Sequence, residues 1–353
     1  MRISIFFPSL LLAATLASAQ TQTTLPAANM GGDAAAQIAA AQPYYDFTSA
    51  SLEPWHLKAT YQFYDSNGNP TEQGKWEYWW ASPKVHRESW TRGGLSRNEW
   101  STADGRLFRM DRGGSLRYFE RRLESTLLSP LPASSVPGED SLRLELKMVE
   151  AGGAQLARVS IQPQRLAGGH PAEPNSAEEY FFDRPTHALR MKYSNQLTTG
   201  YNQIARMQGR YLARQVEVLA GKQRIFSITV ESVEWMDAAD SALTPDPEAT
   251  DVTARTADQP EEAGPGAESP VKKTAPVYPL MAQASRTQGT VILAAVIGKD
   301  GKIHDMEVLA APSPLLAGSA ENAVKTWEYK PPVLNGVPVE SEAVVDVTFG
   351  LSQ

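Results

Sequence analysis

Residues that could perform chemistry are few in this sequence, and they are poorly grouped. The five histidines stand at positions 56, 86, 170, 187 and 304, and no two have the i, i+4 spacing of a helical zinc site. His304 and Asp305 are neighbours in an expected strand, where successive side chains point to opposite faces, so they cannot act as a pair. Cysteine is absent, which excludes a thiol nucleophile, a thiolate metal site and disulfide bonds.

Two further features are better explained by structure than by chemistry. Asp300-Gly301 resembles the start of a calcium loop but lacks its spaced carboxylates and terminal glutamate, so we interpret it as a turn. Asp183 and Arg184 precede Pro185 and indicate a polar corner at a strand end. The sequence contains no G-x-S-x-G elbow, P-loop or dinucleotide fingerprint. We therefore expect no catalytic residue, no metal and no cofactor, and predict that the protein is not an enzyme.

The last residues form a pattern of a different kind. Ala343, Val345, Val347 and Phe349 are all apolar and alternate with Val344, Asp346 and Thr348, which is the two-residue period of a β-strand. A strand at the edge of a sheet exposes unpaired backbone groups that invite another chain to pair with it. The edge could therefore be open for a partner, could pair within a dimer, or could be a plain edge blunted by Asp346.

Length and charge limit the possible classes of protein. A chain of 353 residues is too long for one ordinary core, so about two domains are expected. The net charge of −7 argues against binding to nucleic acid, which requires clustered lysine and arginine.

The N-terminus has the pattern of an export signal. Met1-Arg2 is basic, Ile3–Leu16 is mostly apolar, and Ala17-Ser18-Ala19 supplies a small-x-small cleavage pattern. The apolar run is shorter than the roughly 20 residues needed to span a bilayer. We predict a cleaved signal peptide at residues 1–19 and a periplasmic protein. The alternative is an uncleaved inner-membrane anchor with the rest of the chain facing the periplasm.

The remaining chain divides into four segments. Residues 20–45 are rich in Ala, Gln and Gly and predict a flexible N-terminus with at most one short helix. Residues 46–236 carry repeated alternation with Gly and Asn punctuation, which predicts one large, curved antiparallel sheet resembling a half-barrel. Residues 237–271 are acidic and rich in Pro and Ala, which predicts a disordered linker. Residues 272–353 predict a small domain of order α-β-β-α-β, so the fold class is α+β and mainly β.

The small domain carries a specific set of motifs. Tyr278-Pro279 opens its short first helix, Gly289 precedes its first strand and Asp300-Gly301-Lys302 forms its hairpin turn. Trp327 with Pro331 follows the second helix, and Asn335-Gly336 turns the chain before the last strand. Together and in this order, these features resemble the C-terminal domain of TonB energy-transducer proteins, over about residues 272–353.

The resemblance implies a function for the terminal strand. Domains of this family bind a short extended peptide, the box of an outer-membrane TonB-dependent transporter, which adds as a strand beside the last strand. The implied peptide-binding residues are Gln283, from a matching position in the first helix, and Ala343, Val344, Val345, Asp346, Val347, Thr348 and Phe349. An exposed helix position without function is the alternative for Gln283.

Two departures bear on energy transduction. Family members keep an N-terminal membrane helix that engages inner-membrane motor proteins, a partnership that is possible here only if the first segment is an anchor. Family members also carry a long Pro-Lys and Pro-Glu spacer that crosses the periplasm. Here the stretch from Asp237 to Pro276 is about 40 residues, and a coil of that length averages only about 35 Å from end to end.

The large domain faintly resembles the half-barrels of LolA-type lipoprotein carriers. The resemblance lies in its pattern of strands and its aromatic residues, not in a motif. It implies an alternative function, a periplasmic carrier of lipid or lipoprotein acyl chains with the TonB-like domain as a docking module. An ordinary core accounts equally for aromatic residues such as Tyr61, Phe63 and Trp76.

Overall fold

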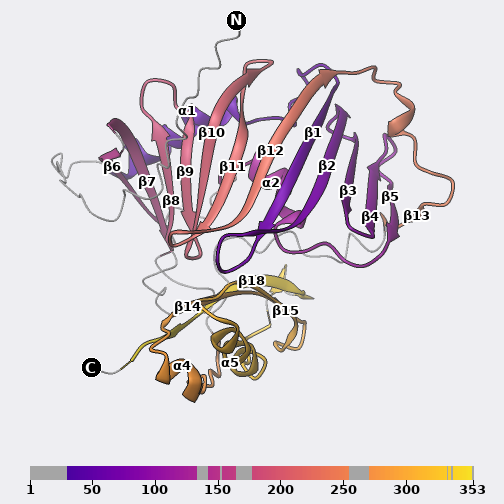
Figure 1. Ribbon diagram of the computed structural model, residues 1–353. Coiled ribbons are helices and arrows are strands. Elements are labelled where there is room, and N and C mark those ends of the chain that lie inside the picture. Colours follow the sequence, from indigo (N-terminus) through magenta and orange to yellow (C-terminus); the bar gives the residue numbers. More distant parts are fainter. Residues whose placement is uncertain are drawn as a thin grey trace, which may run out of the picture.

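The computed structural model describes residues 30–132, 142–151, 153–163, 177–253, 270–331, 333–334 and 337–351. A large curved sheet lies above a smaller sheet that carries helices on its far side (Figure 1). The expected fold class, mainly β with one large antiparallel sheet and a small C-terminal α+β domain, is confirmed. The expected signal peptide lies outside the described residues.

The large sheet contains thirteen strands in the described part of the chain, in the order β13-β5-β4-β3-β2-β1-β12-β11-β10-β9-β8-β7-β6. All its pairings are antiparallel, and β1 lies in the middle because it pairs with β12, with Trp55 opposite Trp235. The strands are β1 Trp55–Tyr64, β2 Pro70–Ser82, β3 Val85–Arg92, β4 Leu95–Ser101, β5 Leu107–Arg112, β6 Leu142–Ala151, β7 Ala154–Pro163, β8 Glu178–Asp183, β9 Leu189–Ser194, β10 Leu197–Met207, β11 Arg210–Ala220, β12 Gln223–Trp235 and β13 Thr250–Asp251.

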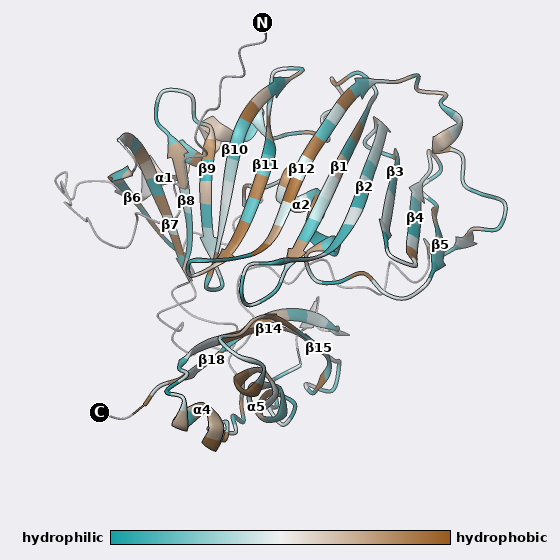
Figure 2. Ribbon diagram, viewed as in Figure 1, coloured by the Kyte–Doolittle hydropathy of each residue, from teal (hydrophilic) through white to brown (hydrophobic). Residues whose placement is uncertain are grey.

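One face of this sheet forms the core. Alternate residues of β1 and β2 are buried, among them Trp55, Tyr61 and Trp76, as the two-residue period requires. The hydropathy colours of Figure 2 show the corresponding alternation along β1 and β12. Two helices, α1 (Met30–Ala41) and α2 (Leu123–Leu127), contribute Ile38 and Leu127 to the same core cluster. In this structure the aromatic residues therefore pack a hydrophobic core, which is the simpler of the two interpretations given above.

Two segments differ from the sequence-based expectation of flexibility. Within the expected flexible N-terminus, α1 buries Ala34 and Ala41 completely, because its small residues let the helix pack closely against β6 and β7. Within the expected linker, residues 237–253 are packed on the large domain. Leu243 and Val252 are buried, and the carbonyl of Ala242 accepts hydrogen bonds from Trp100 and Arg87. The rest of the expected linker, residues 254–269, lies outside the described part.

The C-terminal domain has a three-stranded sheet in the order β15-β14-β18. Its strands are β14 Gly289–Ile297, β15 Ile303–Ala310 and β18 Ser341–Phe349, its helices are α4 Leu280–Ala284 and α5 Pro314–Val324, and the short β16 Val333–Leu334 and β17 Val337–Pro338 pair with each other. Helix α5 begins where Ser313 accepts a hydrogen bond from the Leu316 amide, and buries Leu316, Ala320 and Val324 against the sheet. Trp327 lies beyond the end of α5, as the motif order indicated, and is buried in this core.

Candidate functional site

The terminal strand β18 is the edge of the small sheet. Its inner side pairs with β14 along its whole length, from Ser341 opposite Ile297 to Phe349 opposite Gly289. On its outer side no strand of the described residues pairs with it. Ala343, Val345, Val347 and Phe349 are buried in the core that includes residues of α5, so one face of β18 is packed.

Gln283 lies close to one end of this edge. Its side-chain amide is exposed and donates a hydrogen bond to the carbonyl of Tyr278, at 3.1 Å. The ring of Tyr278 in turn packs against Phe349, with centroids 5.4 Å apart, and its hydroxyl donates to the Thr287 carbonyl at 2.7 Å. The structure therefore brings Gln283 near the Phe349 end of the strand, while Ala343 lies at the other end.

The remaining predicted site residues face away from α5. The hydroxyls of Thr348 and Thr290 are 3.0 Å apart across the two strands. Val344 packs against the core cluster of the large domain. Asp346 lies near β9. Its charge contributes, after burial and the charge of Glu179, to raising the pKa of Tyr193 on that strand. This face of the strand thus meets the large domain.

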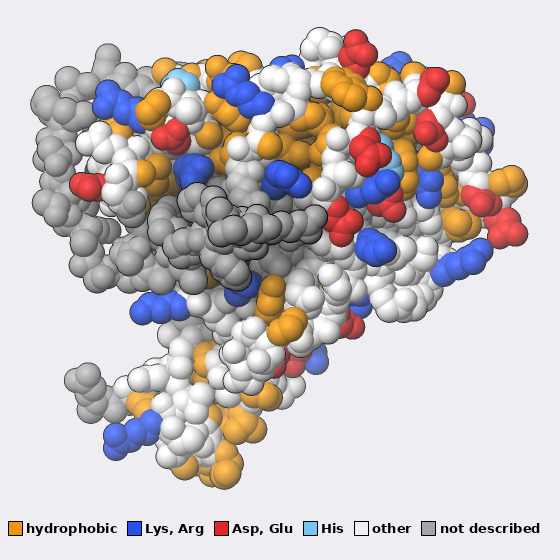
Figure 3. Space-filling view, turned by 45° about the horizontal axis from the view of Figure 1, so that its top comes forward, with side chains coloured by type: hydrophobic (Ala, Val, Ile, Leu, Met, Phe, Trp, Pro, Cys, Tyr) orange, Lys and Arg blue, Asp and Glu red, His pale blue; other side chains and the backbone are white. Residues whose placement is uncertain are grey.

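An apolar surface that the motifs did not indicate lies beside Gln283. Val277, Leu280, Met281 and Leu315 are exposed, Leu280 by 81%, although they are large and hydrophobic. The first three surround the start of α4, and the Val277 carbonyl accepts a hydrogen bond from Ser319 of α5. Hydrophobic side chains are visible on the surface of the smaller lobe in Figure 3. The sequence "VYPLM" contained the signal, a run too apolar for so short an exposed helix.

The hairpin that superficially resembled a calcium loop is a turn. The carboxylate of Asp300 accepts hydrogen bonds from the Lys302 amide and the His304 ring, both at 3.0 Å. These contacts, the backbone amide first, lower the pKa of Asp300. Within the described residues no three His, Asp or Glu side chains are grouped so as to hold a metal ion.

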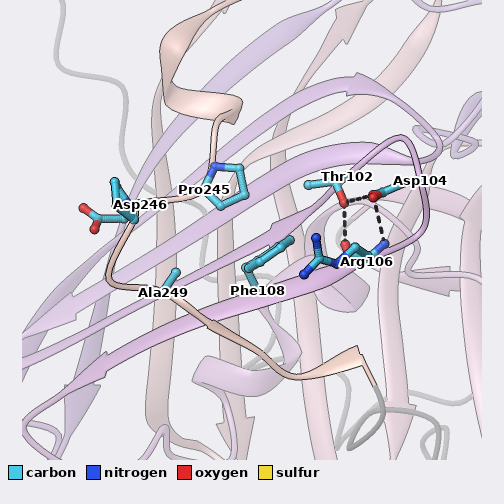
Figure 4. A pocket seen from close by; sticks show the side chains of 8 residues that line it. Thr102, Asp104, Arg106, Phe108, Pro245, Asp246 and Ala249 are labelled. Atoms are coloured by element: carbon cyan, nitrogen blue, oxygen red, sulfur yellow. Dashed lines mark hydrogen bonds between the residues drawn. The ribbon is translucent and has the colours of Figure 1, made fainter.

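A shallow depression lies at the far edge of the large sheet, where the 237–253 segment passes the β4–β5 turn. Its volume is about 400 Å³, and Thr102, Asp104, Arg106, Phe108 and Pro245 are among the residues that line it (Figure 4). Its polar groups are engaged with one another: Thr102 donates to Asp104 at 2.6 Å, and Arg106 pairs with Asp251 at 2.7 Å. The depression gives no indication of a ligand.

No helix in the described part of the chain is long and apolar enough to cross a membrane.

Comparisons with known proteins agree with the motifs of the small domain. Residues 274–351 match the family model described as Gram-negative bacterial TonB protein C-terminal. Protein TonB of Pseudomonas aeruginosa is 36% identical over 75 residues, which cover 21% of this chain and 22% of that protein. Protein TonB of Klebsiella pneumoniae is 29% identical over 79 residues, covering 22% and 32%. The match thus spans less than a third of either relative.

Solved structures are similar to one domain or the other. The solution structure of the P. aeruginosa TonB C-terminal domain is 30% identical and covers 26% of this chain and 95% of that one, with a TM-score of 0.23. A DUF1329 family protein from Desulfovibrio piger, 10% identical, covers 62% and 100%, with a TM-score of 0.40. A LolA superfamily protein from Nitrosomonas europaea, 8% identical, covers 62% and 99%, with a TM-score of 0.31. The chain thus carries, at residues 274–351, a domain of the TonB C-terminal family joined to a large antiparallel β domain.

Proposed function

We propose that the C-terminal domain binds an extended peptide of a partner by strand addition along β18, in the periplasm. The observation that carries this proposal is the asymmetry of β18: its inner side is fully paired with β14, and its outer side is unpaired among the described residues. Backbone hydrogen bonds along Ala343–Phe349 would supply most of the affinity, and side chains would set the register.

The TonB C-terminal match supports a particular partner, a segment of an outer-membrane TonB-dependent transporter. Gln283 would contribute through its exposed amide, which can both donate and accept hydrogen bonds near the Phe349 end of the strand. Partnership with inner-membrane motor proteins requires that the N-terminal segment is an anchor, and it stays a prediction. Transport of acyl chains by the large domain also stays a prediction. In this structure, helices α1 and α2 pack on its apolar face.

The test uses the full chain and a synthetic probe, a blocked peptide of alternating threonine and valine. We expect it to shift the NMR signals of the Ala343–Phe349 amides and of the Gln283 side chain. A peptide with proline at alternate positions is the control, because it lacks the amide donors that a sheet requires. Gln283→Ala should weaken binding, whereas Gln288→Ala, another exposed glutamine of the same domain, should not. Unchanged spectra at about millimolar probe, the weakest affinity worth considering, would contradict the proposal.

A further inference from the structure

The two domains share a continuous apolar interface. Ile292, Ala294, Leu309 and Ala310 of the small sheet belong to the core cluster of the large domain, and Val344 packs against it. These residues lie on the face of the small sheet opposite α5, which we call the docking face. A solvent-exposed sheet face would be polar, so its composition fits permanent or frequent contact with the large domain.

Ion pairs hold the docking face at two places. Glu307 of β15 accepts hydrogen bonds from the Arg117 side chain and from the Tyr118 amide, both at 2.8 Å. Glu342 of β18 binds Arg121 through one carboxylate oxygen and Arg122 through the other, each at 2.5 Å. All three arginines come from Leu116–Leu128 of the large domain, which we call the docking segment.

The docking segment is itself anchored in the large domain. Phe119 stacks on Phe226 of β12 with centroids 4.8 Å apart, and Leu123, Leu127 and Leu128 are buried. Glu120 is fully buried, where it accepts hydrogen bonds from the Tyr61 hydroxyl at 2.5 Å and the Arg92 guanidinium at 2.8 Å. The segment therefore presents its arginines to the small domain from a fixed position.

This contact reaches the outermost strand at two points along β18. Near its beginning, Glu342 is bound by Arg121 and Arg122; farther along, Val344 packs against the core cluster of the large domain. A peptide added beside β18 would lie about 4.8 Å farther out, and every second side chain would point toward the docking face. Those side chains would enter space next to the large domain.

We propose that docking of the two domains and strand addition along β18 oppose each other, so that the docked chain is a closed form of the peptide site. The inference rests on the proposed function. Its consequence is that the apparent affinity for peptide is lowered by the docked fraction, and that bound peptide separates the domains.

Separation can be measured directly, because the chain has no cysteine that would be labelled by accident. Spin labels at Lys84→Cys and Lys325→Cys, both exposed positions, report the distance between the domains. The test variant is Glu307→Gln with Glu342→Gln, which removes both charges but keeps the side-chain size. The matched control is Glu340→Gln, an exposed acid two residues before Glu342. Arg121→Gln with Arg122→Gln removes one of the two contacts from the other side.

We expect one narrow distance in the wild type and the control, and a broad distribution in both arginine and glutamate variants. The threonine–valine probe should bind the glutamate variant at least about fivefold more tightly than the wild type, and saturating probe should broaden the wild-type distribution. Equal affinities, or a wild-type distance that stays narrow with probe bound, would overturn the inference but leave the proposed function standing. A variant that stays docked would also overturn it. Failure of the probe to bind any of the proteins would contradict both.

Discussion

The ring of Tyr278 lies edge-on against Phe349, at a centroid distance of 5.4 Å and an interplanar angle of 71°. This contact joins Tyr278, two residues before α4, to the last residue of β18. It keeps the two parts of the candidate peptide site, Gln283 and the open edge, in a fixed relation.

Removal of the Phe349 ring should destabilise the C-terminal domain. Phe349 is 3% exposed, and Phe349→Ala leaves a cavity beside Tyr278, so we expect a loss of about 3–5 kcal/mol. Urea unfolding monitored by the indole signal of Trp327 measures it. Leu315→Ala is the control, since that side chain is half exposed and should cost below about 1 kcal/mol. Equal losses for both variants would contradict the assignment of Phe349 to the core.

Glu120→Ala should destabilise the large domain strongly. The change leaves the Arg92 guanidinium and the Tyr61 hydroxyl without their buried acceptor, and breaking such a pair costs about 3–5 kcal/mol. Lys58→Gln removes half of an exposed pair with Glu234 and should cost at most about 1 kcal/mol. Urea midpoints of the two variants, compared with the wild type, decide whether the buried network has this role.

Glu88 predicts a pH dependence of stability. Burial, followed by the nearby carboxylates of Glu124 and Glu99, raises its pKa well above the usual value. The folded state then holds a proton that the unfolded state releases near pH 4.3. The resulting stability is present below that pH and is lost as the pH rises through the folded pKa, by up to about 1.4 kcal/mol per pH unit.

Glu88→Gln tests this dependence, because the amide carries no charge and keeps an oxygen to accept the Trp76 indole hydrogen bond, 3.1 Å long in the wild type. We expect the free energy of unfolding to fall less in the variant than in the wild type between about pH 5 and pH 8. This range begins above the pKa of glutamate in the unfolded chain. Glu231→Gln, an exposed position on β12, should leave the wild-type dependence intact. Parallel pH profiles for wild type and Glu88→Gln would refute the prediction.

Gly301→Ala should disrupt the hairpin of the C-terminal domain. Gly301 has φ of +76°, and an added Cβ would lie 2.1 Å from the Tyr329 carbonyl oxygen. Gly68→Ala provides the comparison, since Gly68 has φ of +80° with open space around it. We expect about 1 kcal/mol for Gly68→Ala from backbone strain alone and a clearly larger loss for Gly301→Ala. Thermal unfolding of the two variants distinguishes strain from collision.

Alternation predicted the strands with one apolar face. The alternation of Phe226, Ile228 and Val230 predicted both β12 and its buried face. Val345 and Val347 did the same for β18. Alternation does not identify strands β3 and β4, because both their faces carry polar groups. Glu88 lies opposite Glu99 on one face, and Ser89 lies opposite Asn98 on the other.

Contacts between distant segments were not predictable from local pattern. Leu243 and Val252 are isolated apolar residues in an acidic stretch, and only the folded sheet provides the surface that buries them. The pairing of Glu342 with Arg121 joins residues 221 positions apart, so no local pattern indicated that the large domain covers one face of the terminal strand. The open edge itself could be predicted, and its surroundings could not.

The position of β1 in the middle of the large sheet has a consequence for how the protein acquires its structure. In the described part of the chain, strands β1–β5 and β6–β12 are two meanders of neighbouring strands, and they join along the β1–β12 pairing, from Trp55 opposite Trp235 to Phe63 opposite Phe226. That seam needs residues about 180 positions apart, so its closure is a slow step with high contact order. Until this pairing forms, each half exposes an unpaired edge strand, β1 in one and β12 in the other, to which another chain could pair.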